Sequence, residues 1–223
     1  MDLDLQRIYH HRFDGISPRL KQATWQEIAR WILNDAKGLR GGIPVQSVLD
    51  PACGDGEFLN ACSHGAVSLT GCDLRDRSPL LTPAATFHQG LFQTLKLDQQ
   101  FDLIWISNLL EHLRSPEEIQ DFLIHCRQIL SPNGLVVIMG PNIKYCRSEY
   151  WDFADHCLPL SHLTVIEHLV SAQFAISAVN PKFLPYSFRS RLPADPRLVR
   201  LYLMNSWAWS FLGKQFLIRA KLP

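Results

Sequence analysis

A chain of 223 residues with 47% hydrophobic residues is long enough for one α/β domain with a buried core and appendages. Its formal net charge of +1 gives no argument for a nucleic-acid partner, and we expect none. No stretch of about 18 apolar residues occurs, so a membrane-spanning helix is not expected.

Residues 1–40 are expected to form an N-terminal segment that ends in a helix. Trp25, Ile28, Ala29 and Ile32 recur at helical spacing, which predicts a helix over residues 20–36. The polar stretch before this helix contains Tyr9, Arg12 and Phe13 and has no regular pattern.

The most informative stretch is residues 47–59, which predict a buried strand, a sharp turn and the start of a helix. Asp50 stands where the strand ends, and Gly54 and Gly56 allow the backbone to turn tightly beside a ligand. A second strand, residues 68–74, brings Asp73 about 20 residues after the glycines, a distance that suits a carboxylate accepting hydrogen bonds from ribose hydroxyls. Leu59 replaces the third glycine of a dinucleotide-binding fingerprint, and no P-loop lysine is present.

The order D-x-A-C-G-D-G-x-F-L, followed by the strand-end Asp73, resembles the class I S-adenosylmethionine (SAM)-dependent methyltransferases over roughly residues 45–175. The resemblance implies a Rossmann-like α/β fold: a mostly parallel seven-stranded sheet, helices on both faces and a C-terminal antiparallel hairpin. It implies SAM as cofactor, a methyltransferase domain over residues 41–223, and a lid over the cofactor built from residues 1–40; Tyr9, Arg12 and Phe13 would line this lid or belong to a surface arm. The implied cofactor-binding residues are Asp50, Ala52, Cys53, Gly54, Gly56, Asp73, Leu74, Leu91, Phe92, Asn108, Leu109 and His112.

A third strand is predicted at residues 86–89. Many family members have an acidic residue after this strand, near the adenine, whereas this chain has Gly90-Leu91-Phe92. Adenine would then be held by backbone groups and stacked against Leu91 or Phe92.

A fourth strand, residues 101–108, is nearly all apolar, as expected for a central strand covered on both faces. The segment from Asn108 to His112 contains the Glu-His pair with which the family commonly lines its cleft. The D/N-P-P-Y motif of enzymes that methylate adenine or amide nitrogens is missing, which disfavours DNA N-methylation. Ser115, Pro116 and Glu118 predict a capped helix, and residues 135–139 predict a fifth, parallel strand.

The long connection over residues 140–161 is rich in aromatic and polar side chains, which suits a substrate pocket. It also resembles a bacterial subgroup of small-molecule methyltransferases whose members often accompany glycan or lipid-intermediate biosynthesis. A helix to about residue 174 and strands at 175–184 and 215–220 would complete the fold.

Residues 185–213 form a predicted helical insertion before the last strand. Asp195 and Pro196 begin a helix to Leu212 that is apolar almost all round and has arginines nearby. It would pack on the domain or on a second subunit, as in a homodimer, or lie in a membrane interface. Scattered cysteines without C-x-x-C pairs, and an acidic start without an apolar segment, predict a cytoplasmic protein, with contact to the inner membrane as the alternative.

The chemistry expected of this site is O-methylation of a small molecule or of a glycan or lipid-linked intermediate. A hydroxyl acceptor benefits from a base, and the candidates are His112 and His156, the latter beside Asp155. The spacing of the Asp and His residues in the long connection matches no standard ligand pattern, so no metal site is expected. Two alternatives are a catalytically silent methyltransferase-like binding protein and an NAD-type oxidoreductase.

Overall fold

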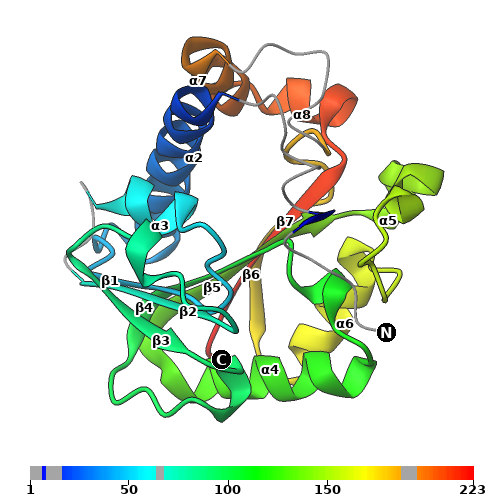
Figure 1. The fold of residues 1–223 in the computed structure, drawn as a ribbon. Helices are drawn as coiled ribbons and strands as arrows, with labels where there is room; N and C mark the ends of the chain where they lie inside the picture. Colours follow the sequence, from blue (N-terminus) through cyan, green and yellow to red (C-terminus); the bar gives the residue numbers. More distant parts are fainter. Residues whose placement is uncertain (1–6, 9–16, 64–67, 187–194) are drawn as a thin grey trace.

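The computed structural model describes residues 7–8, 17–63, 68–186 and 195–223. Within them lies a seven-stranded sheet in the order β3-β2-β1-β4-β5-β7-β6 (Figure 1). Strands β1 to β5 are parallel, and β7 runs antiparallel to both β5 and β6. This confirms the expected mostly parallel sheet with an antiparallel C-terminal hairpin. The strands are β1 (Ser47–Asp50), β2 (Ser68–Asp73), β3 (Ala85–Gln89), β4 (Phe101–Ser107), β5 (Leu130–Pro141), β6 (Ala175–Asn180) and β7 (Gln215–Lys221).

Helices cover both faces of the sheet. In Figure 1, α2, α3 and α7 lie on one side, whereas α4 and α6 lie on the other. The α-helices are α2 (Pro18–Leu39), α3 (Glu57–Cys62), α4 (Pro116–Ile129), α5 (Ile143–Cys146), α6 (His162–Ser171), α7 (Pro196–Met204) and α8 (Ser206–Leu212). Short 3₁₀ turns lie at η1 (Ser78–Leu80), η2 (Phe92–Thr94), η3 (Leu110–His112) and η4 (Arg147–Asp152).

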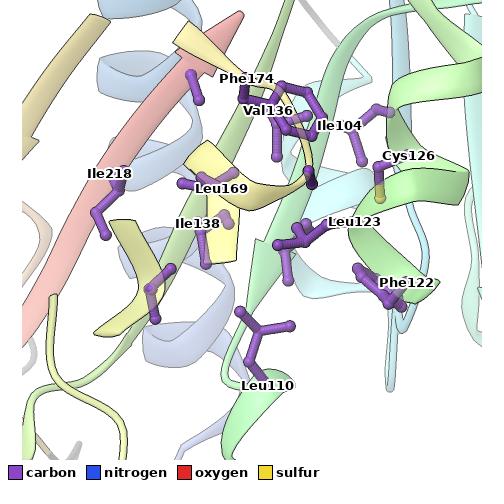
Figure 2. Packing of buried hydrophobic residues seen from close by; sticks show 14 of the residues in the cluster. Ile104, Leu110, Phe122, Leu123, Cys126, Val136, Ile138, Leu169, Phe174 and Ile218 are labelled. Carbon is purple, nitrogen blue, oxygen red and sulfur yellow. The ribbon is translucent and has the colours of Figure 1, made fainter. Parts of the chain in front are cut away.

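The alternation of side chains along the central strands divides the core into two layers. In β4, Ile104 and Ile106 face the layer under α4 and α6, whereas Leu103 and Trp105 face the layer under α2 and α3. Figure 2 shows the first layer, in which Ile104 and side chains of β5 meet those of α4 and α6. Side chains on both faces of β4 are buried, and this explains why its sequence is almost continuously apolar.

A buried ion pair connects elements at the amino ends of the central parallel strands. Arg40, just after α2, donates from Nη2 to Asp102 Oδ1 at 2.6 Å and from Nε to the carbonyl of Asn133 at 2.8 Å. Asp102 also accepts a hydrogen bond from the backbone N–H of Gln46. This pair therefore ties α2, the entry to β1, and the first residues of β4 and β5 together, at the edge opposite the carboxyl ends.

The C-terminal helical insertion differs from expectation. The single helix predicted from Asp195 to Leu212 is wrong, because Asn205 separates α7 from α8. The Asn205 side chain donates to the carbonyl of Leu201 at 2.6 Å, and its backbone has φ −118° and ψ 84°. An amide side chain that bonds to nearby backbone groups competes with the helix at this point.

Two strand boundaries also differ from expectation. Strand β5 begins at Leu130 rather than at residue 135, and β6 ends at Asn180 rather than at residue 184. Pro181 follows β6 and has no N–H to donate to a sheet ladder, which explains the early end. The proposed lid residues Tyr9, Arg12 and Phe13 lie outside the described residues.

Candidate active site

The candidate site lies where the strand order reverses. Strand β1 has β2 on one side and β4 on the other, so chain connections diverge between β1 and β4. Ligands of open α/β sheets bind in the crevice beyond the carboxyl ends of the strands at such a point. Asp50, Asp73 and Asn108 end or directly follow β1, β2 and β4, so the structure brings these three predicted residues to one edge.

The two glycines of the first turn have different roles. Gly54 has φ 52°, and a Cβ placed on it would meet no atom within 4 Å, so its surface is open to a ligand. Gly56 has φ 77°, a backbone conformation that favours glycine, and a Cβ there would lie 2.2 Å from Cδ2 of Leu81 unless that side chain moved. The open backbone at Gly54 is what a closely approaching cofactor needs.

Asp73 joins the glycine turn to the loop after β2. Its Oδ2 accepts from the N–H of Gly54 at 3.1 Å, and its Oδ1 accepts from the N–H of Arg75 at 3.0 Å. A carboxylate offers about four acceptor positions, so room is left for the two hydroxyls of a ribose. Leu74, the next residue, is exposed at the same edge. The sequence did not single out Arg77, which forms an ion pair with Asp55 at 3.0 Å and approaches Asp73 at 3.8 Å.

Asp50 is the most perturbed acid of the site. Burial raises the pKa of its carboxyl to about 8, and the nearby charges of Glu57 and Asp73 act in the same direction. The N–H of Ala52 donates to its Oδ1 at 3.2 Å and partly offsets that effect. Cys53 is also buried, which raises the pKa of its thiol, so it contributes an uncharged side chain to the turn.

Asp50 should therefore make the cofactor-free protein less stable as pH rises. Between the unfolded pKa of 3.8 and the folded pKa of about 8, the unfolded carboxyl is ionised while the folded one keeps its proton. The free energy of unfolding should then fall by up to about 1.4 kcal/mol per pH unit in that window. Urea unfolding at several pH values should show a shallower slope for Asp50→Asn than for wild type; equal slopes would contradict the assignment.

The residues expected at the adenine separate in the structure. Leu91 is exposed, whereas the Phe92 side chain is only 3% exposed and packs against Phe122 at a centroid distance of 5.0 Å. The expectation that Phe92 offers a stacking surface is therefore wrong, because its ring belongs to the core layer under α4. Leu91 is the exposed side chain of the two.

Asn108 and Leu109 turn the chain sharply after β4. Asn108 is in the left-handed region with φ 48°, and its N–H donates to the carbonyl of Met139 at 2.9 Å. The turn leads directly into η3, which carries Glu111 and His112. Glu111 is buried, and its carbonyl accepts the N–H of Cys157 and of Leu158, so the segment is held against the long connection.

His112 is oriented by Asp155, one of the predicted catalytic residues. Its Nδ1 lies 2.8 Å from the backbone carbonyl oxygen of Asp155 and 3.5 Å from the carboxylate Oδ2 of the same residue. A carbonyl oxygen can only accept, so Nδ1 carries a proton, and in the neutral ring the lone pair is on Nε2. The Glu111 carboxylate lies 4.0 Å from that Nε2. The sequence pairs Asp155 with His156, whereas the structure brings Asp155 to His112.

The aromatic loop surrounds His156. The His156 ring stacks on Phe153 at 5.1 Å and meets the edges of Tyr150 at 4.8 Å and His112 at 5.1 Å. Tyr150 is fully buried; its hydroxyl donates to the carbonyl of Leu158 at 2.6 Å and accepts from the N–H of Leu160 at 3.1 Å. The expectation that Tyr150 lines a substrate pocket is therefore wrong. It holds the loop that presents Asp155, whereas Trp151 is exposed.

One group among the described residues could also hold a metal ion. Ligand atoms of Glu111, His112 and His156 all lie within 4.8 Å of one another. The sequence predicted no metal site, because the spacing of the Asp and His residues in the long connection matches no standard ligand pattern. The adjacency of Glu111 and His112 was the available signal for this cluster.

Comparison with known proteins identifies the family. A family model described as a methyltransferase domain matches residues 9–174, which is more than half of the chain. Two curated relatives are named ubiquinone biosynthesis O-methyltransferase. The protein from Pasteurella multocida (strain Pm70) is 26% identical over 125 residues, a region covering 48% of this chain and 49% of that protein. The one from Roseobacter denitrificans is 32% identical over 113 residues, covering 45% of this chain and 40% of that protein.

The fold is shared with solved structures at low sequence identity. A SAM-dependent methyltransferase from Archaeoglobus fulgidus superposes with a TM-score of 0.64 and 19% identity, covering 98% of this chain and 100% of that one. The matched regions span less than half the length of each curated relative. The family match, the shared fold and the glycine turn agree with one another. The chain therefore belongs to the class I SAM-dependent methyltransferases, with S-adenosylmethionine as its cofactor.

Proposed function

We propose that this methyltransferase methylates a hydroxyl oxygen of a small molecule, with His112 as general base. The observation that carries the proposal is the 2.8 Å contact between His112 Nδ1 and the carbonyl oxygen of Asp155. This contact fixes the tautomer in which Nε2 is a proton acceptor. A neutral hydroxyl needs such an acceptor, whereas an amine that arrives unprotonated does not.

The residues divide the work between binding and proton transfer. Asp73 and the open backbone of Gly54 would hold the donor, which supplies a methyl group already activated on a sulfonium. As the acceptor oxygen gains the methyl group and the donor sulfur loses it, the hydroxyl proton passes to Nε2 of His112. The Glu111 carboxylate, 4.0 Å from Nε2, and the Asp155 carboxylate, 3.5 Å from Nδ1, would stabilise the imidazolium that forms.

The names of the two curated relatives support a small aromatic alcohol as acceptor. Both are called ubiquinone biosynthesis O-methyltransferase. The exposed Trp151 and the Phe153 ring beside His156 provide apolar surface near the proposed base. Glycans and lipid-linked intermediates are the second acceptor class to test.

The direct test is transfer of labelled methyl groups from SAM to pools of phenols, lipid-linked glycans, sugar nucleotides and amines. We expect label on the phenols. Label on amines alone would overturn the O-methylation proposal. Binding of SAM without transfer to any pool would instead favour the silent binding protein.

Removing metal ions tests whether His112 acts as a general base or as a metal ligand. We expect turnover to persist in excess EDTA, because the lone pair of His112 Nε2 accepts the proton without an ion. Inactivation by EDTA with recovery on adding Mg²⁺, Mn²⁺ or Zn²⁺ would show that Glu111, His112 and His156 act as metal ligands. Calorimetric titration with each ion in the absence of acceptor provides an independent readout.

A further inference from the structure

The two C-terminal helices, α7 and α8, expose six large apolar side chains, which are named below and are called the α7–α8 surface. Trp207 is 68% exposed and Phe211 is 79% exposed, and their rings lie 6.3 Å apart on α8. The α7–α8 surface consists of Leu198, Leu201, Met204, Trp207, Phe211 and Leu212. Large exposed apolar side chains that lie together, as Trp207 and Phe211 do, are typical of an interaction site.

These side chains are not needed for packing the helices on the domain. The opposite faces of α7 and α8 already bury Leu203 and Trp209 in the layer shared with α2. The Trp209 ring lies 5.4 Å from that of Trp31, and its Nε1 donates to the carbonyl of Tyr202. The helices therefore have a packed inner face and a separate apolar outer face.

The C-terminal part of the sequence is rich in basic residues. Residues 181–223 contain eight lysine and arginine residues and one acidic residue, Asp195, whereas residues 1–180 contain 14 basic and 20 acidic residues. Arg197 and Arg200 are exposed on α7, on the same side as Leu201 and Met204. Neither arginine forms an ion pair within the described part of the chain. The net charge of the whole chain is small because an excess of basic residues in 181–223 offsets an excess of acidic residues in 1–180.

We infer that the α7–α8 surface docks on an anionic phospholipid bilayer. Trp, Phe and Leu side chains enter the boundary between headgroups and acyl chains, and adjacent arginines are attracted to anionic headgroups. A two-fold pairing of this surface with a second copy would place Arg197 and Arg200 near their own equivalents, which is unfavourable. No helix among the described residues is both long and apolar enough to cross a membrane, so the contact is at the surface.

The chain just after α8 is bonded to the long connection that follows β5. Lys214, two residues after α8, forms an ion pair with Glu149 of η4 at 2.5 Å. Its carbonyl accepts the N–H of Asn142, which follows β5. The α8 end is therefore fastened to the connection that carries Asp155 and His156.

Vesicle flotation tests the inference with the full chain. Wild type should float with phosphatidylcholine vesicles that contain phosphatidylglycerol, and much less with phosphatidylcholine alone. Trp207→Ser combined with Phe211→Ser should lower the partition coefficient by about tenfold or more, because two exposed rings no longer enter the bilayer. Arg197→Gln combined with Arg200→Gln should lower it by about fivefold for each charge and weaken its salt dependence.

A matched control is available on α6. Leu163 and Val170 are also exposed and apolar, so Leu163→Ser with Val170→Ser should float like wild type. SAM binding by calorimetry confirms that each variant is folded. Failure of wild type to float, or equal loss in the α6 control, would overturn the inference. A dimer in light scattering that disappears in the Trp207 and Phe211 variant, without flotation, would assign the surface to a second copy. Flotation needs neither cofactor nor acceptor, so its failure is distinct from failure of the proposed O-methylation.

Discussion

Replacing His112 by Asn should lower turnover by about 10²–10⁴-fold, the usual contribution of a general base. The Asn amide nitrogen takes the place of Nδ1 and can still donate to the carbonyl of Asp155, so the connection to the long loop is kept. What is lost is the Nε2 lone pair. SAM affinity measured by calorimetry should stay near that of wild type.

His156→Asn is the matched control, because the two rings lie 5.1 Å apart and share the same surroundings. It should reduce turnover far less than His112→Asn. A larger loss in His156→Asn would move the base to that residue. Near-normal turnover in both variants would mean that positioning alone, or an acceptor that arrives ionised, accounts for the reaction.

Replacing Asp73 by Ala should weaken SAM binding by about 1.5–3 kcal/mol, or roughly 10- to 150-fold, because two ribose hydroxyls lose a charged acceptor. The same change also removes the acceptor of the Gly54 and Arg75 N–H groups, so the melting temperature should fall. Asp73→Asn keeps the shape of the side chain and one carbonyl oxygen, so it should lose affinity with less loss of stability. Calorimetry and thermal unfolding of the two variants separate these effects.

Asp76→Asn is the control for Asp73. Asp76 lies on the same loop, and its Oδ1 accepts from the backbone N–H and the hydroxyl of Ser78. It carries the same charge but does not contact the glycine turn in the structure. Unchanged SAM affinity in Asp73→Ala, or an equal loss in Asp76→Asn, would show that Asp73 does not hold the ribose.

The donor side of the site could be predicted from the sequence because its signals are local. Asp50, Gly54 and Gly56 lie within seven residues of chain, and the strand that follows ends at Asp73. Hydrophobic periodicity also predicted the central strands and the capped α4, whose Ser115 accepts the N–H of Glu118 as expected. The mostly parallel seven-stranded sheet with its antiparallel C-terminal hairpin followed from the family resemblance and is confirmed.

The acceptor side could not be predicted because its contacts join distant residues. The carbonyl that orients His112 belongs to Asp155, 43 residues later, and a backbone carbonyl has no sequence signature. Tyr150 belongs to the aromatic connection that the sequence predicts to suit a substrate pocket. Its hydroxyl instead bonds to two backbone groups of its own loop, and no local sequence pattern indicates these bonds. The break at Asn205 likewise depends on a side chain bonding to the preceding turn, which outweighed the apolar periodicity on both sides.

The position of β7 has a consequence for synthesis of the protein on the ribosome. This strand is made after every other strand of the sheet, yet it lies between β5 and β6, and β6 has no other neighbour. While residues 215–221 are still inside the exit tunnel, β5 presents an open apolar edge and β6 has no partner. Unpaired edges of this kind promote association between nascent chains. Slow translation near residue 215 should therefore increase aggregation. A truncation just before this residue should leave the edge of β5 unpaired and β6 without its strand partner.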